Sequence, residues 1–396
     1  MSLRGVVVIG GGNAGLSVAG RLHRYGIEDV VVIEPRAEHL YRPLFSHVAG
    51  GTARASQAKR PQQEALPRGV DWIRAAVTGV DPGARTVTLD SGEVVGYRQL
   101  IVCPGMERRW DLVAGLPEAI TMPEVSSHYE LGLAAKTSRL LKNLRRGTVV
   151  FTQPAGPAAC SGASQKPMYL ACDYWRSTGV LDDIRVVLVV PTPTIFGIPA
   201  IDTELERKVD EYGIEVRYAS ELVEVNGTAR SIVLRADDGS DSRIGYDVLN
   251  VVPPQRAPEW IEESGLSAPA ANGFAAVDPH TLQHVRHPEV WSLGDAADTT
   301  NSKSGGALRK QTKVLAQNLR AVLAGDAPTA AYDGYTVAPF TVSRHTVVFA
   351  EFDDRYRQKP TVPFWKGLAR ERRLTWVFDR HILPWVYWHL ILKGRA

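Results

Sequence analysis

"VVVIGGGNAG", residues Val6 to Gly15, is the most informative segment of this 396-residue chain. Its β-branched residues predict a buried strand, and a helical stretch follows. Between the two, Gly10, Gly12 and Gly15 form a G-x-G-x-x-G pattern. The first glycine permits a tight turn, the second lets the backbone approach a pyrophosphate, and the third lets helix and strand pack closely. The segment therefore predicts a strand–loop–helix unit that binds a dinucleotide at the helix N-terminus, with Asn13 and Ala14 among the binding residues.

An acidic residue ends the next strand of this unit. The run "VVVIE" ends at Glu34, whose carboxylate would accept hydrogen bonds from a ribose hydroxyl. Far along the chain, "WSLGDAAD" places Gly294 and Asp295 between a strand and a long helix. This pair resembles the second flavin motif of the disulfide-reductase-like flavoproteins, whose aspartate contacts the ribityl chain of FAD. The resemblance implies that the dinucleotide is FAD, and Lys303, just before the helix, would stabilise negative charge on the reduced flavin.

A second alternation of strand-like and helix-like runs begins near Leu112 and predicts a second parallel sheet. We therefore expect an α/β protein with two Rossmann-like dinucleotide-binding domains, of which the first is discontinuous. The FAD-binding domain takes residues 1–111 and 268–330, the second domain takes residues 112–267, and residues 331–396 form a third region of different composition. Gly105 closes the strand-like run "LIVCPG" of the first domain, and we include it among the residues that bind FAD.

Composition and charge limit the possible functions. With 44% hydrophobic and 22% charged residues the chain suits a globular protein of more than one domain, and a net charge of +3 gives no reason to expect a nucleic-acid partner. Three cysteines are too few for a disulfide framework, so we expect a reducing compartment. The first residues lack the apolar core of a secretory signal, so we expect no such signal. No apolar run is long enough to span a membrane, so we also expect no transmembrane helix. We also predict no metal site.

The segment after the strand "TVVFT" differs from the first glycine loop. It reads "QPAGPAACSGASQKP", with Gln153 and Pro154 where close approach to a pyrophosphate requires glycine. Cys160 lies at the start of a predicted helix, and Lys166 adds a positive charge one turn further on. Both features favour the thiolate, which is the nucleophile of sulfur chemistry, so we predict that Cys160 and Lys166 are catalytic.

The other two cysteines are predicted to be structural. Cys172 lies about ten residues into the same helix, and at 1.5 Å per residue this puts it roughly 15 Å from the helix start, beyond the reach of a disulfide. Cys103 ends a strand of the first domain. We therefore expect no disulfide between Cys160 and Cys172.

"CSGASQK" resembles the C-x-G-x-x-Q-K segment of the sulfide:quinone oxidoreductases, above all of the branch that includes the mitochondrial enzyme. Further stretches agree with that family along almost the whole chain: "EPRAEHLYRPLFSHVAGG", "PTIFGIP", "TLQHVRHPEVWSLGD", "YDGYTVAPF", "VVFAEFD" and "LPWVYWHLILKG". These enzymes have two Rossmann-like domains, bind FAD, sit on a membrane and pass two electrons from sulfide to a quinone. The resemblance implies that Cys160 lies over the flavin, that Tyr41 and Pro43 in "YRPL" line its ring system, and that Val77 contacts the adenine.

One position departs from the family pattern. The family uses two redox cysteines, and the second would occupy the position of Ala338; Ala296 likewise replaces a cysteine that some relatives carry after the Gly-Asp pair. Three interpretations follow. Cys160 works alone and an external thiol or sulfide removes the sulfur; or the protein is an NAD(P)H:quinone oxidoreductase; or it is a non-catalytic membrane flavoprotein that senses sulfur species or quinone. We favour the first, an FAD-dependent enzyme that oxidises sulfide or a related sulfur compound.

The residues from Pro363 onward predict contact with a membrane. Tryptophans and basic residues gather there, and we expect Pro384 to divide the region into two short amphipathic segments, neither long enough to span a bilayer. A dimer interface and a helix pair packed on the core are the alternatives. We predict peripheral association with the cytoplasmic face of a membrane and a membrane quinone as electron acceptor, with Phe340 and residues 348–352 as candidate neighbours of the quinone. The sequence is also compatible with a homo-oligomer.

Overall fold

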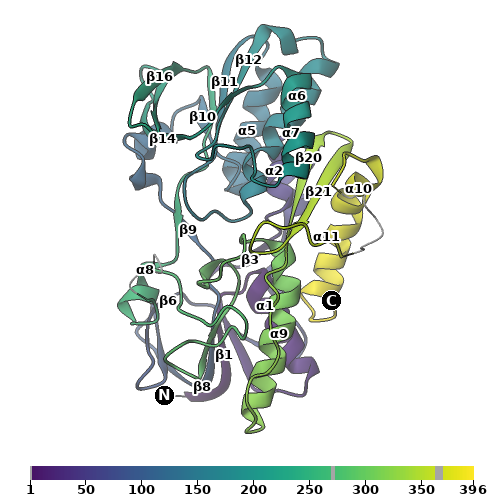
Figure 1. Ribbon diagram of the computed structural model, residues 1–396. Coiled ribbons are helices and arrows are strands. Elements are labelled where there is room, and N and C mark those ends of the chain that lie inside the picture. The colour runs from purple at the N-terminus through teal and green to yellow at the C-terminus, as the bar shows by residue number, and fades with distance from the viewer. Residues whose placement is uncertain (1, 269–272, 362–368) are drawn as a thin grey trace.

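The computed structural model describes residues 2–268, 273–361 and 369–396 (Figure 1). The glycine-rich segment lies in a βαβ unit that consists of β1 (Ser2–Ile9), α1 (Asn13–Arg24) and β2 (Val30–Ile33). The two strands are parallel, and their β-branched residues are almost completely buried, as expected for a parallel strand pair covered on both faces. The predicted strand–loop–helix unit is confirmed.

In the described residues, the first sheet has seven strands, in the order β5-β2-β1-β8-β7-β6 with β19 paired to β8. β1 and β2 are parallel to β5 (Asp71–Ile73) and β8 (Val94–Val102), whereas β7 (Thr86–Leu89) and β6 (Val77–Asp81) add an antiparallel hairpin. β19 (Val290–Ser292) comes from far along the chain and joins β8 in parallel. The sheet therefore combines residues from before and after the second domain.

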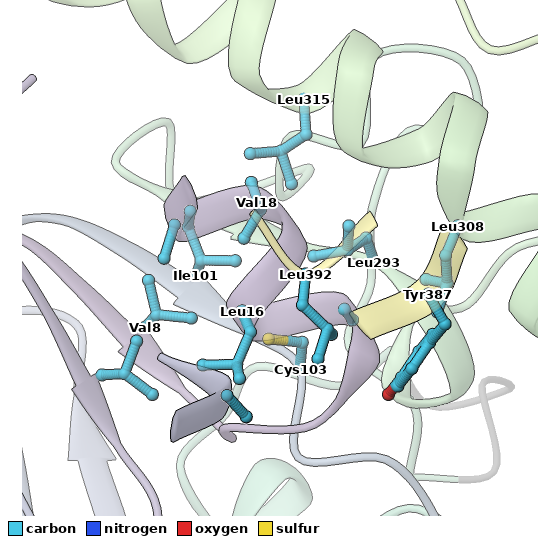
Figure 2. Packing of buried hydrophobic residues seen from close by; sticks show 14 of the residues in the cluster. Val8, Leu16, Val18, Ile101, Cys103, Leu293, Leu308, Leu315, Tyr387 and Leu392 are labelled. Atoms are coloured by element: carbon cyan, nitrogen blue, oxygen red, sulfur yellow. The ribbon is translucent and has the colours of Figure 1, made fainter. Parts of the chain in front are cut away.

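Two long helices cover one face of this sheet. α1 lies beside α9 (Gly305–Leu323), and the residues between the helices and the sheet form a buried cluster (Figure 1). Figure 2 shows part of this cluster, with Leu16 and Val18 of α1 near Leu293 and Leu315. Each such buried side chain contributes about 1.5–3 kcal/mol relative to an exposed one, so this packing fixes where the glycine loop at the start of α1 lies.

The second sheet has five parallel strands, in the order β10-β17-β11-β12-β13, which confirms the predicted second parallel sheet. Its strands and the helices of this domain are β10 (Val125–Ser126), β17 (Val248–Asn250), β11 (Gly147–Thr152), β12 (Ile184–Val189), β13 (Glu215–Arg217), α5 (Leu131–Asn143), α6 (Lys166–Ser177) and α7 (Pro199–Tyr212). An antiparallel sheet of β14 (Ser220–Asn226), β15 (Ser231–Ala236) and β16 (Asp241–Gly245) adjoins it. The domain boundaries themselves stay a prediction.

Shorter elements connect these parts. They are β3 (Glu38–Leu40) paired with β4 (Lys59–Pro61), β9 (Glu107–Arg108) paired with β18 (Gln255–Arg256), the short helices α2 (Leu44–Ala49), α3 (Gln62–Ala65), α4 (Leu116–Ala119) and α8 (Glu259–Glu263), and the 3₁₀ turns η1 (Ala55–Ala58), η2 (Trp110–Leu112), η3 (Ser161–Ser164), η4 (Leu181–Asp183) and η5 (Gly294–Ala296).

The third region begins with a hairpin of β20 (Thr336–Ser343) and β21 (Thr346–Phe352), and β20 contacts α6 of the second domain and α9 of the first. A continuous helical segment follows, which we call the C-terminal helix: α10 (Arg373–Val377), a π-helical turn at Phe378–Ile382, α11 (Leu383–Val386) and a second π-helical turn at Tyr387–Ile391.

The prediction that Pro384 divides this region into two segments is wrong, because the helical backbone runs through it. Pro384 lies in the first turn of α11, directly after a π-helical turn. Proline lacks a backbone amide hydrogen, and its ring crowds the preceding helical turn. The π-helical turn before Pro384 is wider and has a different hydrogen-bond pattern, so the helical backbone continues past the proline. Trp365 and Lys366, which also entered the membrane prediction, lie outside the described residues.

One face of the C-terminal helix packs on the first domain. Tyr387, Trp388 and Leu392 belong to the buried cluster around α1, and Figure 2 shows Tyr387 and Leu392 within it. The Tyr387 hydroxyl lies 2.6 Å from His39 Nε2, and the Arg60 guanidinium lies 4.5 Å from the centre of the Trp388 ring. The segment is therefore part of the core, while its other face exposes five large apolar side chains: Leu374, Val377, Phe378, Ile382 and Trp385.

Candidate active site

The loop after β1 leaves room for another molecule beside its backbone. Gly10 has a φ of +103°, a conformation that favours glycine, and a Cβ on Gly15 would overlap the carbonyl oxygen of Gly10. A Cβ on Gly12, in contrast, would meet no protein atom within 4 Å. Gly10 and Gly15 are therefore required by the protein itself, whereas the space beside Gly12 is available to a ligand at the N-terminus of α1.

Glu34 is buried beside this loop. Its carboxylate accepts hydrogen bonds from the Gly11 amide (2.9 Å) and from the amide and guanidinium of Arg36 (3.0 and 2.9 Å). Burial by itself would raise the pKa of Glu34, but the contacts with Arg36 outweigh burial and hold the pKa below its usual value. The carboxylate is thus fixed and negatively charged next to the glycine loop, which is what recognition of a ribose hydroxyl requires.

One cavity of about 730 Å³ joins the glycine loop to the second domain and to the C-terminal helix. Its walls are mostly apolar with a few polar and charged groups, and its volume lies in the range of ligand-binding cavities. The predicted site residues that line it are Gly12, Asn13, Ala14, Glu34, Tyr41, Pro43, Gly105, Cys160, Lys166, Asp295 and Lys303. The structure therefore brings most of the predicted site together, although these residues come from both predicted dinucleotide-binding domains, and residues of the third region complete the wall.

Four predicted cofactor-binding residues do not line the cavity. Gly10 and Gly15 determine the backbone conformation of the loop and its packing on the strand. Gly294 donates its amide hydrogen to Gln311 Oε1 (3.0 Å) at the start of the turn that presents Asp295. Val77 begins β6 at the edge of the first sheet. The contact of Val77 with the adenine, like the other contacts with FAD, stays a prediction.

Cys160 is held in the cavity by both domains. Its φ is +55°, an unfavourable conformation for a residue other than glycine, and its amide donates to the Lys303 carbonyl oxygen at 2.7 Å. The Tyr129 hydroxyl lies within hydrogen-bond distance of the carbonyl oxygens of Ala159 (3.0 Å) and Cys160 (3.3 Å). The helix predicted to start beside Cys160 is the 3₁₀ turn η3, and α6 begins at Lys166. These bonds fix the strained backbone and hold the thiol toward the cavity.

Burial works against the thiolate of Cys160. It raises the pKa of the thiol, and the charge of Lys166 lowers this pKa only in part. The net direction is opposite to the sequence-based prediction, which considered the helix N-terminus and Lys166 but not burial. Lys166 is itself only 3% exposed at the start of α6. Formation of a thiolate at Cys160 therefore depends on this one buried cation more strongly than the sequence indicated.

Lys303 and Asp295 place opposite charges on the first-domain side of the cavity. The Lys303 ammonium donates to the Ala297 carbonyl oxygen (2.6 Å) and lies 4.4 Å from the centre of the Phe274 ring. Burial lowers the pKa of Lys303 to about 8, although Asp295 opposes the shift. Burial raises the pKa of Asp295, and Lys303 and Arg42 oppose that shift. A lysine that titrates near neutral pH thus lies at the position where the sequence predicts a charge beside the flavin.

The structure accounts for the remaining cysteines and for Ala338. Cys172 is fully buried in the core of the second domain and unpaired, so the predicted absence of a disulfide with Cys160 is confirmed. Cys103 is buried, and its Sγ lies 3.8 Å from the Gly10 carbonyl oxygen. Ala338 is 2% exposed on β20, between two residues that line the cavity. The position that corresponds to the second redox cysteine therefore holds a buried methyl group.

The expected neighbours of the quinone are only partly placed at the cavity. Phe340 is fully buried, with its ring 4.8 Å from that of Phe196, and it does not line the cavity. Alternate residues of a strand point to opposite faces, and Phe340 shares the inward face of β20 with Ala338. In the run 348–352, Phe349 and Glu351 do line the cavity.

Sequence reasoning missed one pair of ionisable residues at this site. His47 Nε2 lies 3.3 Å from Asp379 Oδ2, and both side chains are buried. The two residues are 332 positions apart, so no local pattern links them. The available signal was Asp379 itself, one of two acidic residues in the basic segment after Pro363.

Comparison with known proteins agrees with this geometry. The family model of the pyridine nucleotide-disulphide oxidoreductases matches residues 4–314. The mitochondrial sulfide:quinone oxidoreductase of Mus musculus is 32% identical over 98% of this chain and 86% of its own length. The chain belongs to the sulfide:quinone oxidoreductase family.

Two further comparisons extend this result. The mitochondrial sulfide:quinone oxidoreductase of Dictyostelium discoideum is 33% identical over 98% of this chain and 86% of its own length. The X-ray structure of the sulfide:quinone oxidoreductase of Aquifex aeolicus superposes with a TM-score of 0.85 at 18% identity, over all of this chain and 92% of that one. The predicted α/β fold is thereby confirmed. As a member of this family of flavoproteins, the protein is an oxidoreductase.

Proposed function

We propose that this protein is an FAD-dependent enzyme that oxidises sulfide, or a related small sulfur compound, at Cys160 and passes two electrons to a membrane quinone. The observation that carries the proposal is the continuous cavity. It unites a dinucleotide-binding loop, a cysteine, a buried lysine, and the apolar side of the C-terminal helix. The relatives in Mus musculus and Dictyostelium discoideum bear the name of this activity.

The residues present fit FAD. The open space at Gly12 and the N-terminus of α1 suit a pyrophosphate, and the buried carboxylate of Glu34 suits a ribose. Asp295 and Lys303 would hold the ribityl chain and the flavin ring, and Tyr41 of the same domain would lie against the ring. When bound, FAD supplies a two-electron acceptor, which neither a thiol nor a lysine can provide.

Cys160 would take up the sulfur. Its thiol and a hydrosulfide ion combine to a persulfide, Cys160–S–SH, with the release of two electrons and one proton. An external thiolate, RS⁻, then bonds to the outer sulfur and leaves as RSSH, which returns Cys160 to its thiolate. Lys166 would attract the hydrosulfide ion and stabilise the sulfur anion in both steps. Because Ala338 cannot take over the sulfur, the external thiol does what a second cysteine does elsewhere in the family.

The NAD(P)H-dependent alternative has less support. The loop after β11 begins with Gln153 and Pro154, which carry side chains where a close backbone approach would need glycine. The Gln153 side chain also accepts a hydrogen bond from the Ser164 hydroxyl (2.9 Å), which ties it to the cysteine-bearing turn. The sensor alternative has Ala338 as its positive argument, and the experiment below separates all three.

The test is anaerobic mixing of the purified flavoprotein with sulfide, and separately with NADH, while the flavin absorbance is followed. We expect sulfide to bleach the flavin rapidly and Cys160→Ser to slow this at least about 100-fold. Cys172→Ala is the matched control, because it removes a neighbouring thiol that does not reach the cavity. Bleaching by NADH but not by sulfide would replace the proposal with the NAD(P)H alternative. Reduction by neither would favour the sensor.

We further propose that the C-terminal helix holds the protein on a membrane surface. Its exposed apolar residues recur at helical spacing, and Leu374 and Trp385 are 63% and 55% exposed. Several of them also form the rim of the cavity, so a lipid-soluble quinone could enter directly from the bilayer. No helix among the described residues is both long and apolar enough to cross a bilayer. Association with the cytoplasmic face of the membrane and formation of a homo-oligomer stay predictions.

Substitution tests this anchor better than deletion, because deletion would also remove Tyr387 and Leu392 from the core. We expect the double variant Phe378→Glu/Ile382→Glu to lose most of its binding to liposomes in a sedimentation assay, with an unchanged melting temperature. Val285→Glu, at a still more exposed apolar residue elsewhere, is the control. Equal binding of both variants would contradict the proposed anchor.

A further inference from the structure

A buried acid–base pair connects α2 with the C-terminal helix. His47 of α2 lies with its Nε2 3.3 Å from Oδ2 of Asp379, and the side chains are 3% and 9% exposed. Burial of two ionisable groups is costly unless they bond to each other, so the pairing itself is readily understood. Its position needs a further explanation, because the pair lies at the wall of the cavity.

The imidazole has a partner on its other side as well. His47 Nδ1 lies 2.9 Å from the Thr52 hydroxyl, and Thr52 is half-buried at the protein surface. The Arg380 guanidinium donates to the Thr52 carbonyl oxygen at 3.1 and 3.2 Å and so fixes this residue. A hydroxyl, an imidazole and a carboxylate are therefore arranged in a line from the surface to the cavity. An imidazole can take a proton at one ring nitrogen and release one at the other.

Asp379 forms the inner end of this line. It lines the cavity next to Phe378, Ile382 and Leu383. Among the described residues of the C-terminal helix that line the cavity, Asp379 is the one with an ionised side chain. Asp379 thus offers a proton-carrying carboxyl group on the part of the cavity wall that the C-terminal helix forms, and Glu351 of β21 also lines the cavity.

Burial and the surrounding charges set the protonation states of His47 and Asp379. Burial lowers the pKa of His47, although Asp379 opposes the shift, so the imidazole is mostly neutral near pH 7. Burial would raise the pKa of Asp379, but His47, Lys166 and Arg380 outweigh it and keep the group a carboxylate. The phenol of Tyr41 and the thiol of Cys160 also face Asp379 and feel its charge. At rest the pair is therefore a neutral imidazole beside a carboxylate, and a proton that enters through His47 can pass to Asp379 and neutralise the buried charge.

The reaction under Proposed function needs such a path. Conversion of a quinone to a quinol takes up two electrons and two protons, and a hydride equivalent brings both electrons with one proton. The second proton has to reach the quinone oxygen from a protein group, since the surrounding wall is apolar. Asp379 is in place to donate it and His47 to replace it.

We propose that His47 and Asp379 relay a proton from the Thr52 side of the protein to the quinone during its reduction. Asp379 is the group that touches the acceptor, and His47 is a positioning and relay residue behind it. The relay rests on the proposed function, in particular on quinone as the electron acceptor. It takes no part in the uptake of sulfur at Cys160.

The test separates the two half-reactions in a stopped-flow instrument. Photoreduced enzyme is mixed with decylubiquinone, and oxidised enzyme is mixed with sulfide. We expect His47→Gln and Asp379→Asn to slow reoxidation by quinone on the order of 100-fold, while reduction by sulfide in His47→Gln changes less than about twofold. His389→Gln, at an exposed histidine of the same helix, is the control and should leave both rates unchanged.

Two readouts distinguish a relay from a structural role. Added imidazole should restore part of the reoxidation rate of a His47→Gly variant, and the pH profile of reoxidation in His47→Gln should fall with increasing pH because protons then come from solvent. In ¹⁵N spectra of the protein, the Nε2 resonance of His47 should shift in Asp379→Asn, which reports the bond independently of turnover.

The outcomes are separable. Unchanged reoxidation in His47→Gln, or equal slowing of both half-reactions with no rescue by imidazole, would overturn the relay. Failure of sulfide to reduce the wild-type enzyme would overturn the sulfide part of the proposed function and leave the relay supported by the photoreduced enzyme. Failure of quinone to reoxidise the wild-type enzyme would overturn both the quinone acceptor and the relay.

Discussion

The loops after β1 and β11 begin alike and end differently. Each leaves the carboxyl end of a central parallel strand and leads to a helix beside the sheet. After β1, residues 10–12 suffice before α1 begins, and a glycine with open space beside it lies at the turn. After β11, residues 153–165 intervene before α6, and they include a 3₁₀ turn and Cys160 with a left-handed backbone.

The difference in loop length shows that a strand–loop–helix unit can serve two kinds of binding site. A short glycine loop offers its backbone amides and a helix N-terminus, which suit a phosphate. A longer loop offers a side chain, and its extra residues carry that side chain away from its own sheet into the cavity shared with the first loop. The hydrogen bond from the Cys160 amide to the Lys303 carbonyl oxygen joins the two halves of this site. We infer that a thiol took the place of a second dinucleotide in this architecture.

The largest effect should come from the glycine loop. Gly15→Ala would force a methyl group into the carbonyl oxygen of Gly10, so we expect the free energy of unfolding of the apoprotein to fall by about 3 kcal/mol or more. Urea unfolding followed by circular dichroism measures this change.

Gly12→Ala is the matched control for that substitution. Its methyl group would enter empty space, so we expect at most about 1 kcal/mol of destabilisation but a loss of FAD affinity of roughly tenfold or more in a fluorescence titration. Equal destabilisation by the two variants would contradict the division of roles between the two glycines.

A smaller effect should come from the residue that ties the thiol loop to its sheet. His128 Nε2 donates to the Ala163 carbonyl oxygen (2.9 Å), and Asn250 donates to His128 Nδ1 (3.0 Å). Burial lowers the pKa of His128 from 6.5 to about 4. Between these values the unfolded chain binds a proton that the folded protein does not, so stability should fall as the pH decreases from 6.5 to 4.

The contribution of His128 to this fall is on the order of 3 kcal/mol, at about 1.4 kcal/mol per pH unit. His128→Gln should therefore flatten the dependence of the unfolding free energy on pH in this window, whereas the exposed His389→Gln should not. A dependence as steep in His128→Gln as in the wild type would show that this histidine is not held neutral.

A small change in stability should come from Ala338→Cys, which adds one sulfur atom to a buried site on β20. We expect less than about 2 kcal/mol of destabilisation, but a sulfide oxidation rate that depends less on the concentration of the external thiol. Ala338→Ser is the control, since it is nearly isosteric and cannot take up sulfur. An unchanged thiol dependence in Ala338→Cys would mean that position 338 does not communicate with Cys160.

Much of this fold follows from local patterns. The G-x-G-x-x-G loop, the buried strands on either side of α1 and the parallel strands of the second domain were all predicted from spacing and composition, because each depends on residues close together in sequence. The position of Cys160 between a strand and a helix followed in the same way. Pro384 misled the prediction because helical backbone can pass a proline through a π-helical turn, which side-chain pattern does not reveal.

The amino-acid sequence by itself thus determined the dinucleotide loop, the thiol and the family, since each is recorded in a short run of residues. Tertiary structure alone decided the charge state and the neighbours of these groups. Burial reversed the expected pKa shift of Cys160, and folding brought His47 to Asp379 across 332 residues and His39 to Tyr387 across 348. The physical reason is that desolvation and long-range pairing depend on where distant segments pack, and no local spacing specifies that.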